Sequence, residues 1–314
     1  MTRHRKILVT CPPMQKSITR YQTLLAENRL EADCPAILQT MTEDALIASL
    51  PSYDGWIIGD DPATARVFAA AVLGRLRGAV KWGVGVDNVD FDGARESGLN
   101  VTHTPGMFGE EVADVALAYL IGLARGLFQI DRGVIDGAWP KPVGMSLQGR
   151  VCAVVGYGDI GQAIARRLTV CGMHVNAYDP NDACFRHSGD VQRVAWPVAI
   201  EEADFVVLSC SLNSQTEQLL DEAFFEQCKP GVRIVNVSRG RLIDEAALAK
   251  ALSSGRVHSA ALEVLACEPL PRDSPLRGFP QLIFGSHNGS NTQEAVDRTS
   301  EKAIRLLVDQ LGPE

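Results

Sequence analysis

The sequence lacks an apolar run long enough to cross a membrane: the longest, around residues 115–124, is about half of the ~20 residues that a membrane helix needs. It also lacks a basic excess, because 30 lysines and arginines stand against 38 aspartates and glutamates, a formal net charge of −8. Nucleic acids and anionic membranes are bound through basic surfaces. We therefore expect neither as a partner, whereas a small anionic substrate needs only one or two local cations.

The eight cysteines form no C-x-x-C pair, and the six histidines show no metal-ligand spacing. Several cysteines lie within apolar runs, which indicates buried free thiols in a reducing compartment. The short apolar stretch at residues 7–9 is followed at once by Thr10, Cys11 and two prolines, which is typical of a first strand and not of a secretory signal. We therefore expect a cytoplasmic protein without a metal site.

Short β-branched runs alternate with helical patterns along the 314 residues. This alternation is typical of an α/β fold with parallel sheets covered by helices, and the length is enough for two domains. Strands are predicted at residues 6–10, 55–58, 79–81, 151–155, 174–178, 205–208, 233–237, 258–262 and 282–284. The longer helices are predicted at residues 110–128, 160–170, 245–254 and 293–311.

A glycine-rich segment after one buried strand fits a dinucleotide. Gly156, Gly158 and Gly161 form the pattern G-x-G-x-x-G between a strand and a helix. Such glycines allow a tight turn, a close approach of a pyrophosphate and close packing of helix on strand. Asp179, at the end of the next strand, is placed to bind a ribose diol, and no basic residue follows within 180–184 to bind a 2′-phosphate. The motif predicts NAD in preference to NADP.

Charged side chains follow three other strands of the same predicted sheet. Arg239, Glu263 and His287 each come at or just after the end of a strand, and Glu268 lies five residues beyond Glu263. Ligands bind beyond the carboxyl ends of parallel strands. Taken singly, such residues are compatible with salt bridges or ordinary polar contacts. Together they favour hydride transfer to a 2-keto acid, which requires a cation for the carboxylate, a proton donor and a carboxylate that stabilises the charged imidazole.

Several motifs in order, between about residues 83 and 295, carry a family resemblance. They are Gly83-Val-Gly-Val-Asp-Asn-Val-Asp90, Thr104-Pro-Gly-Met-Phe108, the glycine loop with Tyr178-Asp-Pro180, Lys229-Pro-Gly231, Asn236-Val-Ser-Arg-Gly240, Glu268-Pro269 and Ser286-His-Asn-Gly289. In these motifs the chain resembles the D-isomer-specific 2-hydroxyacid dehydrogenases, and among them the short members similar to phosphoglycerate dehydrogenase.

The resemblance implies two doubly wound parallel-sheet domains. Residues 1–102 and 288–314 would form a flavodoxin-like substrate domain, and residues 103–287 a Rossmann-type NAD-binding domain. It also implies an NAD-dependent oxidoreductase that interconverts a D-2-hydroxy acid and its 2-keto acid, and a homodimer formed through the NAD-binding domain.

The resemblance further implies roles for single residues. Arg239 would bind the carboxylate and the keto oxygen of the substrate, His287 would be the acid/base, and Glu268 would pair with His287 and stabilise its charged form. Backbone N–H groups around Val84 and Gly85 would complete the carboxylate site. The residues that would bind the cofactor are Gly156, Gly158, Asp159, Ile160, Gly161, Asp179, Cys210, Val237, Ser238, Arg239, Glu263 and His287.

Departures from the family's pattern concern the substrate more than the reaction. Glu263 stands where an aspartate is usual near the nicotinamide, and the histidine motif at 286–290 is more polar than usual. Asp60 and Asp61 occupy a loop in which phosphoglycerate enzymes carry an arginine for the phosphate, although Lys81 offers one cation.

Three interpretations of the substrate-side loop and two other functions stay open. The substrate is 3-phosphoglycerate, or it is a 2-hydroxy acid whose hydroxyl or amino groups donate to Asp60 or Asp61, or the two aspartates only make a turn and cap the next helix. A dehydrogenase of formate or phosphite would need a very small pocket, which polar Asn288 and Asp60 do not favour. A dinucleotide-sensing interaction protein similar to corepressors would need a peptide groove, and no extra apolar segment indicates one.

Overall fold

The computed structural model describes residues 4–185, 189 and 191–312, which divide into two compact units. Unit 1 comprises Met1–Met107 and Asn291–Glu314, and unit 2 comprises Phe108–Ser290. The boundaries expected from the sequence, 102/103 and 287/288, lie a few residues earlier. Thr104 still belongs to unit 1 because its hydroxyl accepts a hydrogen bond from the Gly83 N–H at 2.8 Å. His287 belongs to unit 2 because its N–H donates to the Glu263 carbonyl at 2.9 Å.

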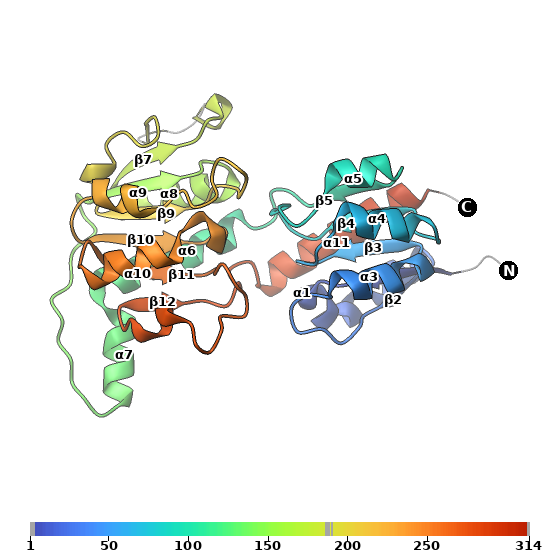
Figure 1. The fold of residues 1–314 in the computed structure, drawn as a ribbon, viewed down its shortest axis with the longest axis horizontal. Helices are drawn as coiled ribbons and strands as arrows, with labels where there is room; N and C mark the ends of the chain where they lie inside the picture. Colours follow the sequence, from blue (N-terminus) through green and yellow to red (C-terminus); the bar gives the residue numbers. More distant parts are fainter. Residues whose placement is uncertain (1–3, 186–188, 190, 313–314) are drawn as a thin grey trace. The chain divides into compact units, whose positions relative to one another are not determined.

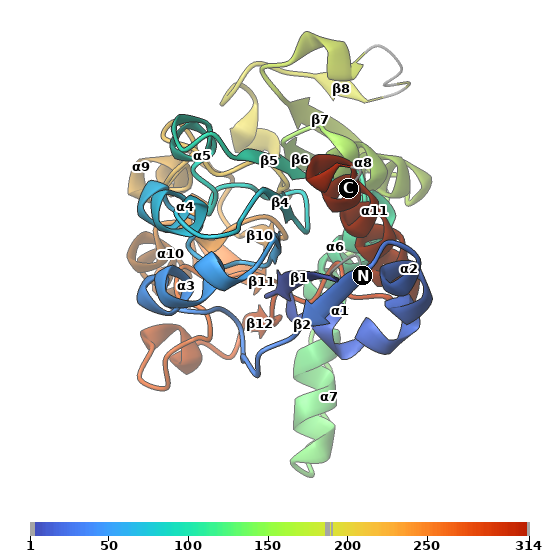
Figure 2. The same ribbon diagram turned by 90° about the vertical axis from the view of Figure 1, so that its right-hand side faces the viewer.

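Unit 1 is built on a five-stranded parallel sheet with the order β2-β1-β3-β4-β5, the order of flavodoxin-like folds. The strands are β1 (Arg5–Val9), β2 (Leu30–Asp33), β3 (Gly55–Ile58), β4 (Gly78–Lys81) and β5 (Asn100–His103). Figure 2 shows α1 (Pro12–Lys16), α2 (Gln22–Glu27) and α11 (Gln293–Leu311) on one face, and α3 (Glu43–Ser49), α4 (Ala65–Val72) and α5 (Phe91–Glu96) on the other.

Apolar spacing explains how the helix α11 joins this sheet from the far end of the sequence. Its buried residues recur every three or four positions, as one face of a helix requires. Thr292 caps its first turn by accepting a hydrogen bond from the Ala295 N–H at 3.2 Å. The bounds predicted for this helix, residues 293–311, are confirmed.

Unit 2 is built on a seven-stranded parallel sheet with the order β12-β11-β10-β9-β6-β7-β8. The strands are β6 (Val151–Val155), β7 (His174–Tyr178), β8 (Gln192–Arg193), β9 (Phe205–Leu208), β10 (Val232–Asn236), β11 (Val257–Leu262) and β12 (Leu282–Phe284). Figure 2 shows α6 (Gly109–Arg125) and α8 (Asp159–Val170) on one face, and α9 (Glu222–Gln227) and α10 (Glu245–Ser253) on the other. The two doubly wound parallel-sheet domains are thus confirmed.

The helix predicted at residues 110–128 is two helices, because Gly126 adopts a left-handed backbone conformation (φ +65°) and ends α6. The second helix, α7 (Leu127–Ile135), buries none of its residues and projects from its unit (Figure 1). Among the described residues, only α6 and α7 together, bent by 70°, have the length and composition of a membrane span, and no single helix does. Val112, Tyr119 and Leu123 of α6 are buried within unit 2. The cysteines are free thiols, of which Cys11, Cys152 and Cys228 are buried and Cys267 is exposed, so the expected burial holds for only some of them.

Candidate active site

The strand order of unit 2 reverses between β6 and β9, and a crevice at the carboxyl ends of these strands is where such sheets bind ligands. The glycine loop lies there. Gly156 has φ +92°, and a Cβ on it would lie 2.4 Å from the backbone nitrogen of Cys210. A Cβ on Gly161 would lie 2.0 Å from the Gly156 carbonyl oxygen, so the helix packs closely on the strand. Gly158 has nothing within 4 Å of that position, which leaves the loop open to a pyrophosphate.

The N-terminus of α8 follows Gly158, and no side chain among the described residues caps it. The backbone N–H groups of Asp159 and Ile160 therefore lie in the uncapped first turn, where an anion binds favourably. The carboxylate of Asp159 lies against the start of α6, since a Cβ on Gly109 would be 2.6 Å from its Oδ2. The cradle fits the diphosphate of a dinucleotide.

Asp179 lies at the end of β7 and is held by two backbone donors. Its Oδ2 accepts from the Tyr157 N–H and its Oδ1 from the Asn181 N–H, both at 2.8 Å. It lines a cavity of about 580 Å³, a size typical of ligand sites. The other residues that line this cavity are Val155, Gly156, Tyr178, Pro180, Arg193, Val194, Ala195, Trp196, Cys210, Gln215, Thr216 and Leu219.

Two residues that line this cavity, Cys210 and Arg193, add to what the sequence predicts for it. Burial raises the pKa of the Cys210 thiol to about 11, so it contributes an uncharged wall. Arg193 was not predicted at this cavity, because it lies beyond residues 180–184, where a partner for a 2′-phosphate is expected in sequence. Its guanidinium pairs with Asp182 and lies 5.3 Å over the ring of Phe185.

His287 and Glu268 form a pair in unit 2. The Nδ1 of His287 lies 2.8 Å from Glu268 Oε2, and Glu268 Oε1 accepts from the Leu265 N–H at 2.9 Å. His287 adopts a left-handed conformation, φ +56°, which is rare for a residue with a side chain. The pairing fixes the ring by one nitrogen and directs Nε2 away from the carboxylate.

Glu263 is buried behind this turn. Its carboxylate accepts hydrogen bonds from the Tyr119 hydroxyl and the Asn288 N–H, and its backbone carbonyl accepts from the His287 N–H. Burial and the adjacent carboxylate raise the pKa of Tyr119. A Cβ on Gly285 would lie 1.9 Å from Glu263 Oε2. Glu263 and Tyr119 thus support the backbone of the histidine turn. The expected place of Glu263 beside the cofactor stays a prediction, and nothing in the sequence pointed to Tyr119.

Arg239 lies in the turn after β10, which buried Asn236 fixes from both sides. Asn236 accepts from the Ser238 N–H at 3.1 Å and donates to the Arg239 carbonyl at 2.8 Å. The Ser238 hydroxyl donates to the Cys210 carbonyl. A Cβ on Gly240 would lie 1.9 Å from the carbonyl carbon of Leu265, so this turn packs on the segment that leads to Glu268.

Unit 2 therefore presents a cation, a carboxylate and an imidazole at the carboxyl ends of the adjacent strands β10, β11 and β12. Val237, also expected at the cofactor, is buried directly after β10. The sequence predicts these charged residues at one edge of the sheet, and the structure places them there. Their roles in binding stay predictions.

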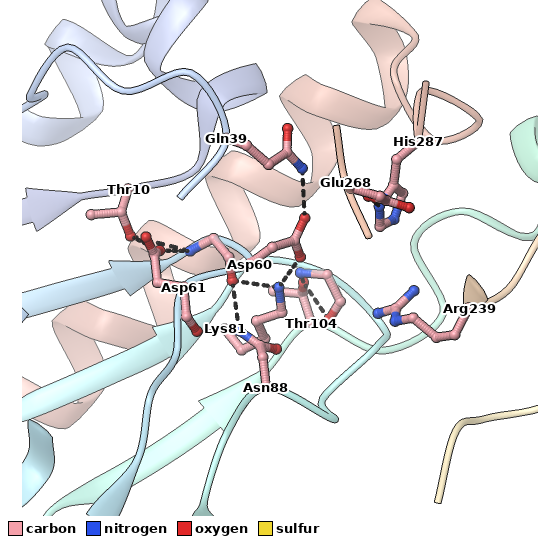
Figure 3. A network of polar contacts seen from close by, with 12 residues as sticks. Thr10, Gln39, Asp60, Asp61, Lys81, Asn88, Thr104, Arg239, Glu268 and His287 are labelled. Carbon is pink, nitrogen blue, oxygen red and sulfur yellow. Dashed lines mark hydrogen bonds and ion pairs between the residues drawn. The ribbon is translucent and has the colours of Figure 1, made fainter. Parts of the chain in front are cut away.

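In unit 1, Asp60 follows strand β3 and Lys81 is the last residue of the adjacent strand β4 (Figure 3). The side chain of Lys81 is 3% exposed, and its Nζ donates to the Gly59 carbonyl at 2.6 Å and to Asp60 Oδ1 at 2.9 Å. The expectation of one available cation is thus changed, because Asp60 already balances this ammonium group.

Asp61 is fully buried and holds the loop together. Its carboxylate accepts from the N–H groups of Met41 at 2.8 Å and Gly59 at 3.1 Å and from the Thr10 hydroxyl. Burial raises its pKa. A substrate has no access to a fully buried carboxylate, so the suggestion that Asp61 accepts from substrate is wrong. The cap on α4 is Thr64, so the suggestion of an aspartate cap is also wrong.

The loop at Gly83, Val84 and Gly85 leaves β4 at the same edge. Thr104 fixes Gly83, and among the hydrogen bonds of the described residues none uses the N–H of Val84 or Gly85. Two neighbouring backbone donors are suited to a carboxylate.

No group of three or more His, Cys, Asp or Glu in the described part of the chain is arranged to hold a metal ion.

Residues 117–289, more than half of the chain, match the model of the D-isomer specific 2-hydroxyacid dehydrogenase family, NAD binding domain. The chain belongs to the D-isomer-specific 2-hydroxyacid dehydrogenase family. The match also confirms the prediction of NAD as the cofactor of unit 2.

Three relatives illustrate the similarity of this chain to known proteins. It is 35% identical to the glyoxylate reductase of Korarchaeum cryptofilum over 79% of this chain and 76% of that protein. It is 35% identical to D-3-phosphoglycerate dehydrogenase 3, chloroplastic, of Arabidopsis thaliana over 86% of this chain and 47% of that protein. The apo-structure of D-lactate dehydrogenase from Escherichia coli superposes with a TM-score of 0.80 at 28% identity, over 96% of this chain and 95% of that one. The chain spans about half the length of the phosphoglycerate dehydrogenases that it matches.

Proposed function

We propose that this protein is an NAD-dependent oxidoreductase that interconverts a D-2-hydroxy acid and its 2-keto acid. The observation that carries the proposal is the His287–Glu268 pair, 2.8 Å between Nδ1 and Oε2, on the NAD-binding unit that also carries Arg239. Relatives with the names of a glyoxylate reductase, phosphoglycerate dehydrogenases and a D-lactate dehydrogenase support it.

Each residue of the set has a role in the reduction of a keto acid. Bound NADH supplies the hydride. The Arg239 guanidinium binds the substrate carboxylate and polarises the keto group. Within unit 1, the N–H groups of Val84 and Gly85 are suited to carboxylate oxygens. Protonated His287 donates the proton from Nε2 to the oxygen that becomes the hydroxyl group. Glu268 orients the ring through Nδ1 and stabilises its positive charge. In the oxidation of a hydroxy acid His287 accepts the proton instead.

The test is NADH consumption by the purified protein with glyoxylate, hydroxypyruvate, pyruvate and 3-phosphohydroxypyruvate. We expect turnover of at least one acid, and a loss of about a hundredfold or more in kcat for His287→Ala with NADH binding retained. An enzyme that consumes none of these acids, or a His287→Ala variant as active as the wild type, contradicts the proposal.

We also propose a homodimer formed through unit 2, in the cytoplasm, where its eight thiols would stay reduced. The projecting helix α7 and the segment after it expose apolar side chains that a second copy would cover: Leu127, Phe128, Val134, Ile135, Trp139 and Val143. Ile135 and Trp139 are 75% and 77% exposed. We expect Ile135→Asp with Trp139→Asp to give monomers in sedimentation experiments, whereas Leu73→Asp, at an 89% exposed position of unit 1, leaves the mass unchanged.

The proposed binding partner is a small 2-hydroxy or 2-keto acid, and neither a nucleic acid nor a membrane is proposed. A wild-type monomer in sedimentation would contradict the dimer without affecting the proposed reaction.

A further inference from the structure

We infer that the substrate carries a hydrogen-bond donor, a hydroxyl or ammonium group, on the carbon next to its keto group, that Asp60 binds this donor, and that a phosphate in its place is disfavoured. The inference rests on the proposed function, since it describes the substrate of that same reaction. Of the substrates considered from the sequence, 3-phosphoglycerate is therefore disfavoured.

The backbone of unit 1 places Asp60 beside the proposed carboxylate site. Strands β3 and β4 are adjacent and parallel with Ile58 opposite Lys81, so the loops that follow them leave the sheet at the same edge. A Cβ on Gly83 would lie 3.9 Å from Lys81 Cε and 4.0 Å from its Nζ. The Asp60–Lys81 pair therefore lies directly beside the loop whose N–H groups at Val84 and Gly85 would bind the carboxylate.

The charge of this pair decides what it accepts. Lys81 is buried and donates to the Gly59 carbonyl as well as to Asp60 Oδ1, so its positive charge is already balanced. The side chain of Asp60 is 39% exposed, so its carboxylate is accessible from the surface of unit 1. The pair is neutral as a whole, but its ammonium group is buried and its carboxylate is exposed, so a ligand meets the carboxylate. This group disfavours a phosphate dianion and accepts from a hydroxyl or an ammonium group.

The loop holds this arrangement in place (Figure 3). Asn88 Nδ2 donates to the Gly59 carbonyl at 3.1 Å and to the Asp61 carbonyl at 2.7 Å. The buried Asp61 carboxylate binds the Gly59 N–H from the other side. Because Gly59 is held on both sides, Lys81 keeps its backbone acceptor and Asp60 keeps its place. Turning Lys81 toward a phosphate would break the bonds to both.

The test compares kcat/KM for hydroxypyruvate and 3-phosphohydroxypyruvate, which share a carbon skeleton and differ in the group at the third carbon. For the wild type we expect a preference of about tenfold or more for hydroxypyruvate. Asp60→Asn should reduce this preference about tenfold or more, because it removes the repelling charge and leaves the charge of Lys81 unbalanced. Adding Lys81→Met to Asp60→Asn should abolish the gain in use of the phosphorylated acid.

The matched control is Asp44→Asn, which removes the same charge from an exposed position of α3 in unit 1 and should leave the ratio unchanged. Both substrates are measured on one preparation of each variant, so a fraction of unfolded protein cancels in the ratio. A wild type that prefers 3-phosphohydroxypyruvate, or an Asp60→Asn variant with an unchanged ratio, overturns the inference while the proposed function stands. If neither of these acids nor glyoxylate nor pyruvate is consumed, the proposed function fails and the inference fails with it.

Discussion

Replacing Tyr119 by phenylalanine removes one hydroxyl group, the hydrogen-bond donor to the buried carboxylate of Glu263. The Asn288 N–H also donates to this carboxylate. A hydrogen bond to a charged group contributes about 1.5–3 kcal/mol, and a buried carboxylate that loses a donor is poorly compensated. We expect Tyr119→Phe to lower the free energy of unfolding of unit 2 by about 2 kcal/mol, which corresponds to a fall of about 4–8 °C in its melting temperature.

Scanning calorimetry with and without NAD measures this change, because NAD raises the transition of the unit that binds it and so identifies that transition. Glu263→Gln should destabilise unit 2 less than Tyr119→Phe does. The glutamine side chain can donate its amide N–H to the Tyr119 hydroxyl while its oxygen accepts from the Asn288 N–H. In the Glu263→Gln background the Tyr119 hydroxyl bonds to an uncharged amide and not to a carboxylate. Tyr119→Phe should therefore cost less in that background than in the wild type, by about 1 kcal/mol or more.

The matched control is Tyr157→Phe, also in unit 2, whose hydroxyl makes no hydrogen bond with any described residue. It should leave the melting temperature of unit 2 nearly unchanged. A Tyr119→Phe protein that melts within about 1 °C of the wild type, or an effect of the same size with Glu263→Gln present, would refute the assignment of a buried charged hydrogen bond.

Three further predictions concern the cofactor cavity and the histidine pair. Asp179→Ala should weaken NADH binding about tenfold or more in a fluorescence titration, and unchanged affinity would contradict its place at the ribose. Because the Cys210 pKa is raised to about 11, its alkylation should be slow at neutral pH, accelerate as the pH rises toward that value and slow again with NAD, whereas exposed Cys267 should react regardless of NAD. Equal NAD protection of the two thiols in peptide mapping would argue against a cofactor in that cavity. Glu268→Gln removes the charge that stabilises the imidazolium, so keto-acid reduction should decline at lower pH than in the wild type, and an unshifted pH profile of kcat would argue against the pair.

The sequence predicts the central strands of both sheets because these are short, β-branched and buried. It does not predict the edge strands β2 and β5, whose residues Leu-Glu-Ala-Asp and Asn-Val-Thr-His are partly polar and solvent-facing, so that no apolar run marks them. It also predicts one helix where Gly126 makes two, since a glycine near the end of an apolar helical pattern is compatible with either.

For the site, chemistry that depends on local motifs was predictable, and the His287–Glu268 pair followed from the family resemblance. Pairs that no motif carries were not predictable. The glycine loop and Asp179 lie within one strand-helix-strand segment, where spacing decides the geometry. Lys81 ends β4 but pairs with Asp60, which follows β3, and Asp61 is buried against Thr10, which follows β1. Hydrophobic periodicity within one segment does not predict such contacts between segments. Tyr119 reaches Glu263 across 144 positions of sequence, from a helix in which it looks like one more apolar residue.

The most direct test of the proposed reaction follows the hydride and the configuration of the product in one measurement. The purified protein would reduce its best 2-keto acid with NADH deuterated at both C4 positions, and the product would be resolved on a chiral column and weighed by mass spectrometry. The proposed mechanism predicts the D-2-hydroxy acid with one deuterium at C2, and almost none of it from a His287→Ala variant that still binds NADH. An L-hydroxy acid, a product without deuterium, or an undiminished yield from the His287→Ala variant would contradict it.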